Sequence, residues 1–438
     1  MLGLDMSAMN RSITETPLYS VGGRLRSVTG LMTSVIPAAV GDHCFIMPRK
    51  GEPVLAEVIG FEKDIAYMVP FDVADNLCPG MPVLRKGKGA TVPVGPKLLG
   101  RVVDGLGRPI DDKGPISGCV PVSVNRPAPP AMERQRIREP FVTGTRSIDA
   151  VLTCGRGQRI GIFAGSGVGK STLLGEVAKG SKADVNVIAL IGERGREVAP
   201  FLEDVLGEEG MARSVAVVAT CEQTPLMRVR AAQSAIAIAD HFREAGKNVL
   251  FVIDSLTRLA LAQRELGLLL GEPPSSRGYT PSVFATLANT VERLGNASVG
   301  GITALLTVLV DGGDMDEPIA DYVRGLVDGH IVLDRKLAER GFFPAIDVAR
   351  SISRVATDVV DKPHAQAARK LRSILATYAE VQDLIRIGAY VRGSNAQVDK
   401  AIELMPRVEK FLKQDVGERS TFEQTRQGLF QLAAEWKF

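Results

Sequence analysis

The sequence predicts an α/β protein of three regions: a small all-β region, a parallel-sheet core and a helical C-terminal region. Short Val/Ile/Thr-containing runs broken by Gly and Pro fill residues 21–90, which is typical of small all-β domains. Apolar runs alternate with helix-like stretches in residues 91–362, and apolar residues recur every three or four positions in residues 363–438. The length of 438 residues suits about three domains.

The first region is expected to form a small β-barrel or sandwich. Runs such as RLRSVTGLM, VLAEVIGF and IAYMVPF have the length of strands and end in turn residues. Prolines then punctuate the chain from Pro93 to Pro130. Because proline interrupts helices, we interpret this stretch as a linker and entry segment of the middle region.

The middle region is expected to hold a parallel sheet covered by helices on both faces, because near-continuous apolar strands alternate with helices. The expected strands are residues 160–164, 187–191, 215–219, 249–253 and 302–310, with helix-like stretches at 171–179 and 231–245. After Pro363, apolar residues such as Leu371, Ile374, Tyr378 and Val381 form one stripe of an amphipathic helix, and further helical stretches follow.

Composition excludes several classes of protein. A net charge of +3 argues against bulk electrostatic binding of nucleic acid, and 45% hydrophobic residues argue against wholesale disorder. The five cysteines are widely spaced and form no Cys-x-x-Cys pair, so neither a disulfide framework nor a zinc site is expected. The chain has no apolar run of roughly 18 residues and no secretory signal, so a cytoplasmic protein is expected.

The strongest motif is RIGIFAGSGVGKSTLL, in which an apolar strand enters a Gly-rich loop that a helix follows. This context supports a phosphate-binding loop, because glycines let backbone N–H groups turn toward a polyphosphate and the helix N-terminus adds a favourable dipole. Ala164 replaces the first glycine of the usual pattern, and a chance Gly-rich turn is the alternative. The expected phosphate-binding residues are Gly165, Ser166, Gly167, Val168, Gly169, Lys170, Ser171 and Thr172.

Two carboxylates follow expected strands. Asp254 ends the run VLFVID, where such a fold places a carboxylate that orients magnesium, and Ser171 of the loop is the second expected magnesium ligand. Glu193 of IGERGREV follows another strand and could polarise an attacking water. The alternatives are a simple strand-ending turn for Asp254 and a solvated Glu–Arg loop for Glu193.

Two further features lie in GFFPAIDVARSISRV. Arg350 and Arg354 are far along the chain from the phosphate loop, and either a surface arginine or an arginine finger for a neighbouring subunit fits this spacing. Phe342 and Phe343 could stack on an adenine or fill the core.

Together these motifs resemble the ATPases of type III protein export. This family comprises the flagellum-specific ATPase and its injectisome counterpart, which are relatives of the catalytic subunit of rotary ATP synthases. The resemblance runs from about Val21 to the C-terminus and rests on RGQRIGIFAGSGVGKS, IGERGREV, VLFVIDSLTRLA, GEPPSSRGYTPSVFATL, FPAIDVARSISRV and DLIRIGAYVRGSN. It implies a β-barrel in residues 21–90, a RecA-like P-loop ATPase domain in residues 91–362 and a helical domain in residues 363–438.

The resemblance assigns roles near the phosphates. Lys170, Ser171 and Thr172 would hold the phosphates and magnesium of bound ATP. Glu193 matches the catalytic glutamate, and Arg194 matches its neighbour near the γ-phosphate.

Three more positions match the family. Asp254 matches the magnesium-associated aspartate, and Phe343 falls where an aromatic side chain packs on adenine. Arg354 matches an arginine finger that acts in trans. Residues 272–281 resemble the segment that faces the central channel of the ring.

The resemblance also implies partners. It implies a homohexamer with nucleotide between subunits, a coiled-coil stalk protein in the channel, export substrates and chaperones, and a stator-like regulator on residues 1–20, a flexible segment for which a frayed terminus is the alternative. The chain would be cytoplasmic and peripherally associated with the inner face of the cell membrane, beneath a membrane export gate. Because one chain carries both Glu193 and Arg354, we hypothesise that every interface of the ring is active.

The favoured function is therefore magnesium-dependent ATP hydrolysis that energises export of flagellar proteins. A virulence injectisome ATPase is one alternative, and a non-catalytic, structural nucleotide-binding ring subunit is another. A nucleic-acid translocase is disfavoured, because the N-terminal region has no aromatic stacking platform or basic groove.

Overall fold

The structure is a computed structural model that describes residues 21–438 and divides into two compact units between Thr91 and Val92. The expected partner-binding segment at residues 1–20 lies outside the described residues. Within residues 21–438, no helix combines the length and the apolar character needed to cross a membrane.

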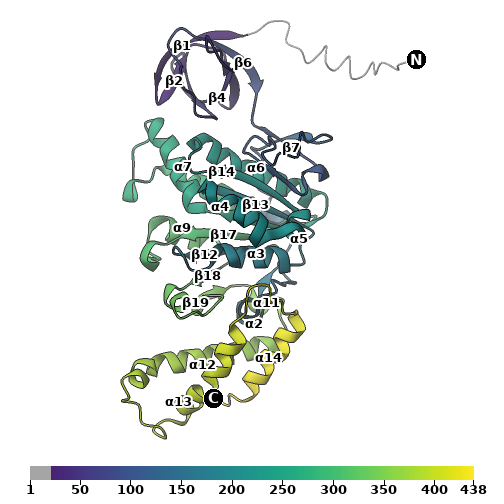
Figure 1. Cartoon of the computed structure of the whole chain (residues 1–438), viewed down its shortest axis with the longest axis vertical. Helices are drawn as coiled ribbons and strands as arrows, with labels where there is room; N and C mark the ends of the chain where they lie inside the picture. The colour runs from purple at the N-terminus through teal and green to yellow at the C-terminus, as the bar shows by residue number, and fades with distance from the viewer. Residues whose placement is uncertain (1–20) are drawn as a thin grey trace, which may run out of the picture. The chain divides into compact units, whose positions relative to one another are not determined.

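The N-terminal unit is a closed six-stranded antiparallel barrel with the strand order β1-β2-β5-β4-β3-β6 (Figure 1). Of the two arrangements expected from the sequence, the chain adopts the barrel, and closure leaves no free strand edge. Its core contains Leu25, Ile46, Met68 and Val83. The strands are β1 (Gly22–Thr29), β2 (Leu31–Ser34), β3 (Asp42–Ile46), β4 (Val54–Glu62), β5 (Ile65–Pro70) and β6 (Pro82–Lys88).

The proline-rich stretch contributes to the fold of the second unit. Its strand β8 (Arg101–Val103) pairs in parallel with β14 and forms one edge of the main sheet. The remaining elements of this stretch are short: β7 (Thr91–Val94), η1 (Pro96–Leu98), β9 (Val120–Ser123), η2 (Ala131–Glu133) and β10 (Pro140–Phe141).

The main sheet of the second unit has the strand order β19-β18-β12-β17-β15-β13-β14-β8. All neighbours are parallel except β18 and β19, so the sheet ends in one antiparallel edge strand. Every residue of β13 is buried, as expected for a strand covered on both faces. The other strands of this sheet are β12 (Arg159–Ala164), β13 (Val185–Glu193), β14 (Ser214–Thr220), β15 (Asn248–Asp254), β17 (Gly301–Leu309), β18 (Gly329–Leu333) and β19 (Ile346–Ser353), with β16 (Gly295–Asn296) paired to β17. The strand β11 (Cys154–Gly155) pairs with β10 in a separate two-stranded sheet.

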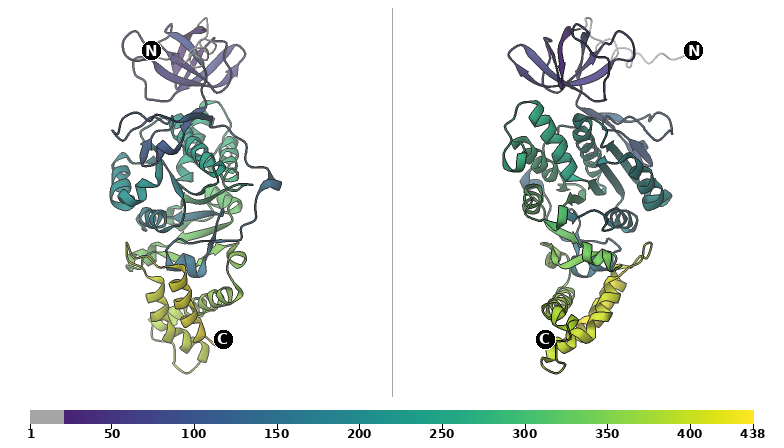
Figure 2. Two further views of the ribbon diagram at one scale, coloured as in Figure 1. Left: turned by 90° about the vertical axis from the view of Figure 1, so that its right-hand side faces the viewer. Right: turned by 60° about the vertical axis from the view of Figure 1, so that its left-hand side comes forward.

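Helices cover both faces of this sheet (Figure 2). Right-handed crossovers between parallel strands place these helices in two groups, one on each face of the sheet. The first group is α3 (Lys170–Gly180), α4 (Gly195–Pro200), η3 (Phe201–Leu206) and α5 (Gly207–Ala212). The second group is α6 (Pro225–Glu244), α7 (Leu256–Leu269), α8 (Pro281–Glu292) and α9 (Pro318–Leu326).

The C-terminal region consists of α12 (Lys362–Arg386), α13 (Ala396–Leu412) and α14 (Phe422–Ala434), shown in yellow tones in Figure 1. These helices pack around α2 (Arg146–Val151), and their buried residues join the core of the sheet domain in one hydrophobic cluster. The single tryptophan, Trp436, is fully buried in this cluster. The remaining short elements are α10 (Arg335–Glu339), α11 (Ala356–Val359), η4 (Ser276–Gly278) and η5 (Asp311–Gly313).

Candidate functional site

The Gly-rich motif forms the loop between β12 and α3. Gly167 and Gly169 have φ values of 76° and 83°, which a glycine adopts without steric cost. Gly169 caps α3, so the N–H groups of the first turn of this helix point toward the loop. Ser166 and Gly167 are exposed, whereas Val168 is buried and anchors the loop. The loop thus offers a ready site for an anion such as a phosphate.

Lys170 contacts both candidate carboxylates. Its Nζ lies 2.5 Å from Asp254 Oδ1 and 3.8 Å from Glu193 Oε1. Neighbouring parallel strands explain this meeting, because Leu190 of β13 pairs with Asp254 of β15 and Glu193 follows at the end of β13. All three side chains are at most 13% exposed, so their charges interact with little screening by water.

Two further residues hold this cluster, and neither is among the site residues predicted from the sequence. Arg258, in the first turn of α7, places Nη1 2.5 Å from Glu193 Oε1. Thr307 of β17 donates its hydroxyl to Asp254 Oδ1 at 2.9 Å. Arg258 follows Asp254 by only four residues in VIDSLTR, but nothing in that spacing indicates that its side chain turns toward a different strand.

Burial raises the pKa of Glu193 above its ordinary value, and the neighbouring charge of Asp254 raises it further. The close ion pair with Arg258 and the positive charge of Lys170 partly offset this rise. A carboxylate whose pKa is raised in this way is better able to accept a proton near neutral pH. The cluster therefore suits Glu193 to proton transfer.

Arg194 and Ser171 lie at the edge of this cluster. The Arg194 side chain is 60% exposed and pairs with Glu197 at 3.2 Å, so the arginine that contacts Glu193 is Arg258. Ser171 is exposed on the first turn of α3, next to Lys170. The hydroxyl of Ser171 and the carboxylate of Asp254 are hard oxygen donors, which fit the preferences of magnesium.

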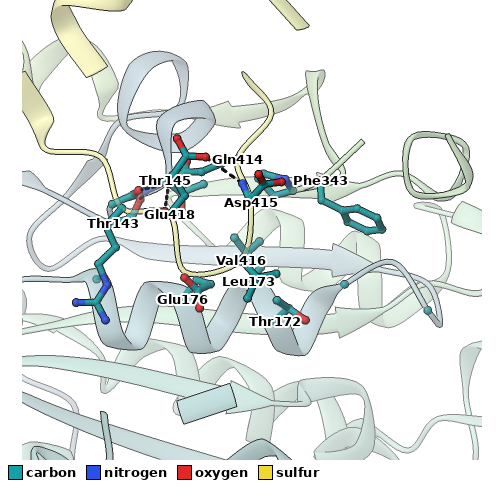
Figure 3. A pocket seen from close by; sticks show the side chains of 16 residues that line it. Thr143, Thr145, Thr172, Leu173, Glu176, Phe343, Gln414, Asp415, Val416 and Glu418 are labelled. Carbon is teal, nitrogen blue, oxygen red and sulfur yellow. Dashed lines mark hydrogen bonds between the residues drawn. The ribbon is translucent and has the colours of Figure 1, made fainter. Parts of the chain in front are cut away.

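A pocket of about 320 Å³ lies beside the loop and α3 (Figure 3). Phe343 is 42% exposed and forms one wall, and Thr172 and Leu173 of α3 lie below it. The opposite wall is the segment 414–419 between α13 and α14, which carries Val416. The pocket joins an aromatic ring and apolar side chains to a few polar groups, a lining that suits a nucleotide base.

Hydrogen bonds that the segment 414–419 donates to three other parts of the chain hold it over the pocket. Gln414 N donates to the carbonyl oxygen of Phe343 at 2.9 Å, and Gln414 Nε2 donates to the carbonyl oxygen of Gly144 at 2.8 Å. Gly417 N donates to Glu176 of α3 at 3.1 Å. No pattern in the sequence indicates this segment, because it is far along the chain from the Gly-rich loop and carries no recognisable motif.

Arg354 lies at the opposite end of the sheet from the Gly-rich loop of its own chain. Ser353, the last residue of β19, pairs with Gly329, and Gly329 pairs with Ile160 at the start of β12. The loop begins after Ala164, four residues along β12, which is about 13 Å at ~3.3 Å per residue. Arg354 is exposed, and its guanidinium donates to the carbonyl oxygen of Arg324 at 3.4 Å.

A Gly-rich loop between a buried parallel strand and a helix, with carboxylates at the ends of neighbouring strands, defines a P-loop nucleotide-binding protein. Residues 144–353 match the family model "ATP synthase alpha/beta family, nucleotide-binding domain". Residues 360–431 match the model "T3SS EscN ATPase C-terminal domain".

Relatives extend the similarity to nearly the whole chain. The "Flagellum-specific ATP synthase" of Bacillus subtilis is 51% identical over 417 residues, which cover 94% of this chain and 95% of the relative. The "Type 3 secretion system ATPase" of Xanthomonas euvesicatoria is 46% identical and covers 92% of each chain. The assembled ATPase EscN of the enteropathogenic E. coli type III secretion system has a TM-score of 0.89 at 42% identity, covering 94% of this chain and 100% of EscN. The chain belongs to the family of flagellum-specific ATP synthases and type 3 secretion ATPases, and it is an ATPase of the ATP synthase alpha/beta family.

Proposed function

We propose that this chain hydrolyses magnesium ATP at sites shared between copies of itself and thereby energises protein export by a flagellar type III apparatus. The observation that carries the proposal is the cluster in which Lys170 meets Asp254 and Glu193 at the end of the Gly-rich loop. The relatives named as flagellum-specific favour the flagellar system, with the injectisome as the alternative.

The phosphates of ATP are expected on the loop residues 165–172, with Lys170 turning from Asp254 to the β- and γ-phosphates. Ser171 and Asp254 would hold magnesium, which neutralises charge on the transferred phosphoryl group when it is bound. The base would occupy the pocket between Phe343 and Val416, where the aromatic ring offers a stacking surface.

Glu193 is the proposed general base. It would accept a proton from a water whose oxygen forms a bond to the γ-phosphorus, while the bond between that phosphorus and the bridging oxygen of ADP breaks. The products are ADP and inorganic phosphate. Arg258 would hold the Glu193 carboxylate in place, and Arg194 would act near the γ-phosphate only if its exposed side chain turned from Glu197.

Arg354 is proposed to complete the site of a neighbouring copy. The register of β19, β18 and β12 separates it from the Gly-rich loop of its own chain, whereas the exposed side chain is free to enter another site. An arginine from a neighbour would stabilise charge that develops on the γ-phosphate. This arrangement requires a ring of copies, for which a homohexamer is proposed.

The proposed partners follow the family. EscN has been solved in complex with its central stalk EscO, and we propose that a coiled-coil stalk protein occupies the channel of this ring as well, facing residues 272–281. Export substrates, their chaperones and a regulator bound to residues 1–20 complete the proposal. The ring would work in the cytoplasm against the inner face of the cell membrane.

The test is the rate of ATP hydrolysis per chain, measured against protein concentration for the wild type and for Glu193→Gln. A rate that rises with concentration and is lost in Glu193→Gln supports hydrolysis at shared sites. Equal rates for the two chains would favour a structural nucleotide-binding subunit, and an equally fast rate at all concentrations from a chain that stays monomeric would exclude the trans role of Arg354.

A further inference from the structure

The outer side of the edge strand β19 carries a row of exposed side chains. Arg350 and Ile352 lie two positions apart on this strand and Arg354 directly follows it; all three are exposed, with Ile352 at 46%. Helix α12 packs against β19 and adds Arg369, exposed, and Arg372, half-buried. We call these five residues the basic face.

The basic face has no internal counter-charge. Among the described residues, none of Arg350, Arg369 and Arg372 forms an ion pair. Arg372 donates only to the carbonyl oxygens of Val348 and Ser351, at 2.9 and 3.1 Å. These arginines line a hollow of about 550 Å³ whose described lining residues include no carboxylate. A charge-rich hollow of one sign is expected to attract a group of the opposite sign.

The pKa of the neighbouring His330 is lowered in part by the positive charge of nearby arginines. Burial lowers the pKa of His330, and the charges of Arg324 and Arg354 lower it further, while its hydrogen bond to the Arg350 carbonyl opposes this. Exposed Ile352 between the arginines adds an apolar contact point, and arginine next to apolar residues is the composition typical of protein interfaces.

A surface of opposite charge lies on the segment between β13 and β14. Glu203 and Asp204 of η3 and Glu208 of α5 are exposed, and we call these three residues the acidic face. In the part of the chain that the structure describes, none of the three forms an ion pair.

The acidic face packs closely against α3, the helix that follows the Gly-rich loop. Gly175 of α3 packs so closely on η3 that a Cβ there would lie 2.2 Å from Val205 Cγ1. The basic face belongs to β19, six strand positions from β14 in the sheet order, or about 29 Å at ~4.8 Å per strand. Charges of opposite sign thus lie toward opposite edges of one sheet.

We propose that the basic face of one chain docks against the acidic face of a second copy, so that opposite charges select the head-to-tail contact that builds the ring. This inference rests on the proposed shared site, because Arg354 belongs to the basic face and the acidic face adjoins the helix that would bind the phosphates. A contact between two different surfaces of identical chains is heterologous and closes into a ring when the rotation permits.

The magnitude of the effect follows from screening. One exposed ion pair contributes little, so the contact needs several opposed charges. The Debye length falls from about 10 Å at 0.1 M salt to about 3 Å at 1 M, so assembly should weaken as salt is added. Complementary charge also suppresses wrong contacts, since two faces of like sign repel each other.

The test introduces charges of the opposite sign on each face in a separate variant, which cancels the net charge of the basic face and reverses that of the acidic face. The basic-face variant carries Arg350→Glu and Arg369→Glu, and the acidic-face variant carries Glu203→Lys, Asp204→Lys and Glu208→Lys. Lys182→Glu with Lys247→Glu is the matched control, because both lysines are exposed and form no ion pair among the described residues. Sedimentation velocity with magnesium and a non-hydrolysable ATP analogue measures assembly, the ATPase rate is measured in parallel, and thermal unfolding by circular dichroism verifies folding.

Each variant alone should remain monomeric at a concentration where the wild type and the control assemble, with an ATPase rate at least about tenfold lower. An equal mixture should recover both assembly and hydrolysis, because the unchanged basic face of one variant meets the unchanged acidic face of the other, and at the remaining contacts the introduced lysines meet the introduced glutamates. Assembly of either folded variant alone, or a mixture that stays monomeric, would overturn the inference.

The proposed function is tested by the rate of ATP hydrolysis, whereas the docking of the two faces is tested by assembly. A wild type that assembles with this charge dependence but hydrolyses no ATP would refute the catalytic proposal and leave the docking faces intact. A wild type that stays monomeric at every concentration would overturn both.

Discussion

Mixing two inactive chains gives a quantitative test of the shared site. An Arg354→Ala chain keeps Glu193 but has no finger, and a Glu193→Gln chain keeps Arg354 but has no general base. If Arg354 acts in trans, a site works only where a chain that retains Glu193 meets a neighbour that retains Arg354. Random assembly of an equal mixture makes this happen with probability 0.5 × 0.5, so about one quarter of wild-type activity should return, whatever the ring size.

The structure sets this expectation, because strand register places Arg354 about 13 Å or more along β12 from the loop of its own chain. Loss of an arginine finger typically lowers the rate by about 10³–10⁵-fold, so the recovery would stand far above the background of either variant. The assay is ATP hydrolysis at varied mixing ratios, where recovery should follow f(1−f) with f the fraction of one variant. No recovery at any ratio, in mixtures shown by sedimentation to co-assemble, would refute the trans role of Arg354.

Three further predictions test the pocket and the cluster. Arg258→Met should raise the pKa of Glu193 further, because it removes the contact and the positive charge that lower this pKa. The acid limb of the pH–rate profile should therefore move to higher pH, and an unmoved acid limb would contradict this. Phe343→Ala should weaken ATP binding by about 1–3 kcal/mol, seen as a higher Kd by calorimetry, whereas an unchanged Kd would remove Phe343 from the base site. Gly175→Ala should destabilise the fold by about 1–3 kcal/mol through its clash with Val205. The control Gly325→Ala, at an exposed helical position with no atom within 4 Å of the added Cβ, should not destabilise it. Equal melting temperatures for the two variants would show that η3 shifts to accommodate the added methyl group.

Contiguous motifs were the part of the site that the sequence predicted directly. The loop, the strand before it and the helix after it are neighbours along the chain, so local patterning was sufficient to predict residues 165–172 as one unit. Asp254 and Glu193 could be placed near that unit because both follow buried parallel strands, and such strands end at one edge of a sheet.

Other parts depended on contacts between distant segments. The sequence allowed a barrel or a sandwich, and only strand pairing distinguishes them, through the contact of β1 with β6. The sequence predicted a linker and entry segment for the proline-rich stretch, yet its strand β8 forms an edge of the main sheet. This pairing could not be predicted locally, because the partner strand β14 is more than a hundred residues away.

The sequence by itself determined the class of chemistry, since a phosphate loop is a local device built from glycines, a lysine and a helix start. The tertiary structure decided which side chains surround it. Arg258 contacts Glu193 because the start of α7 lies beside the end of β13, and the segment 414–419 covers the proposed base pocket because α13 ends beside α3. Side-chain direction and long-range packing produce no periodic pattern in a sequence. For this physical reason, only the tertiary structure identifies Arg258 and the segment 414–419 as neighbours of the site.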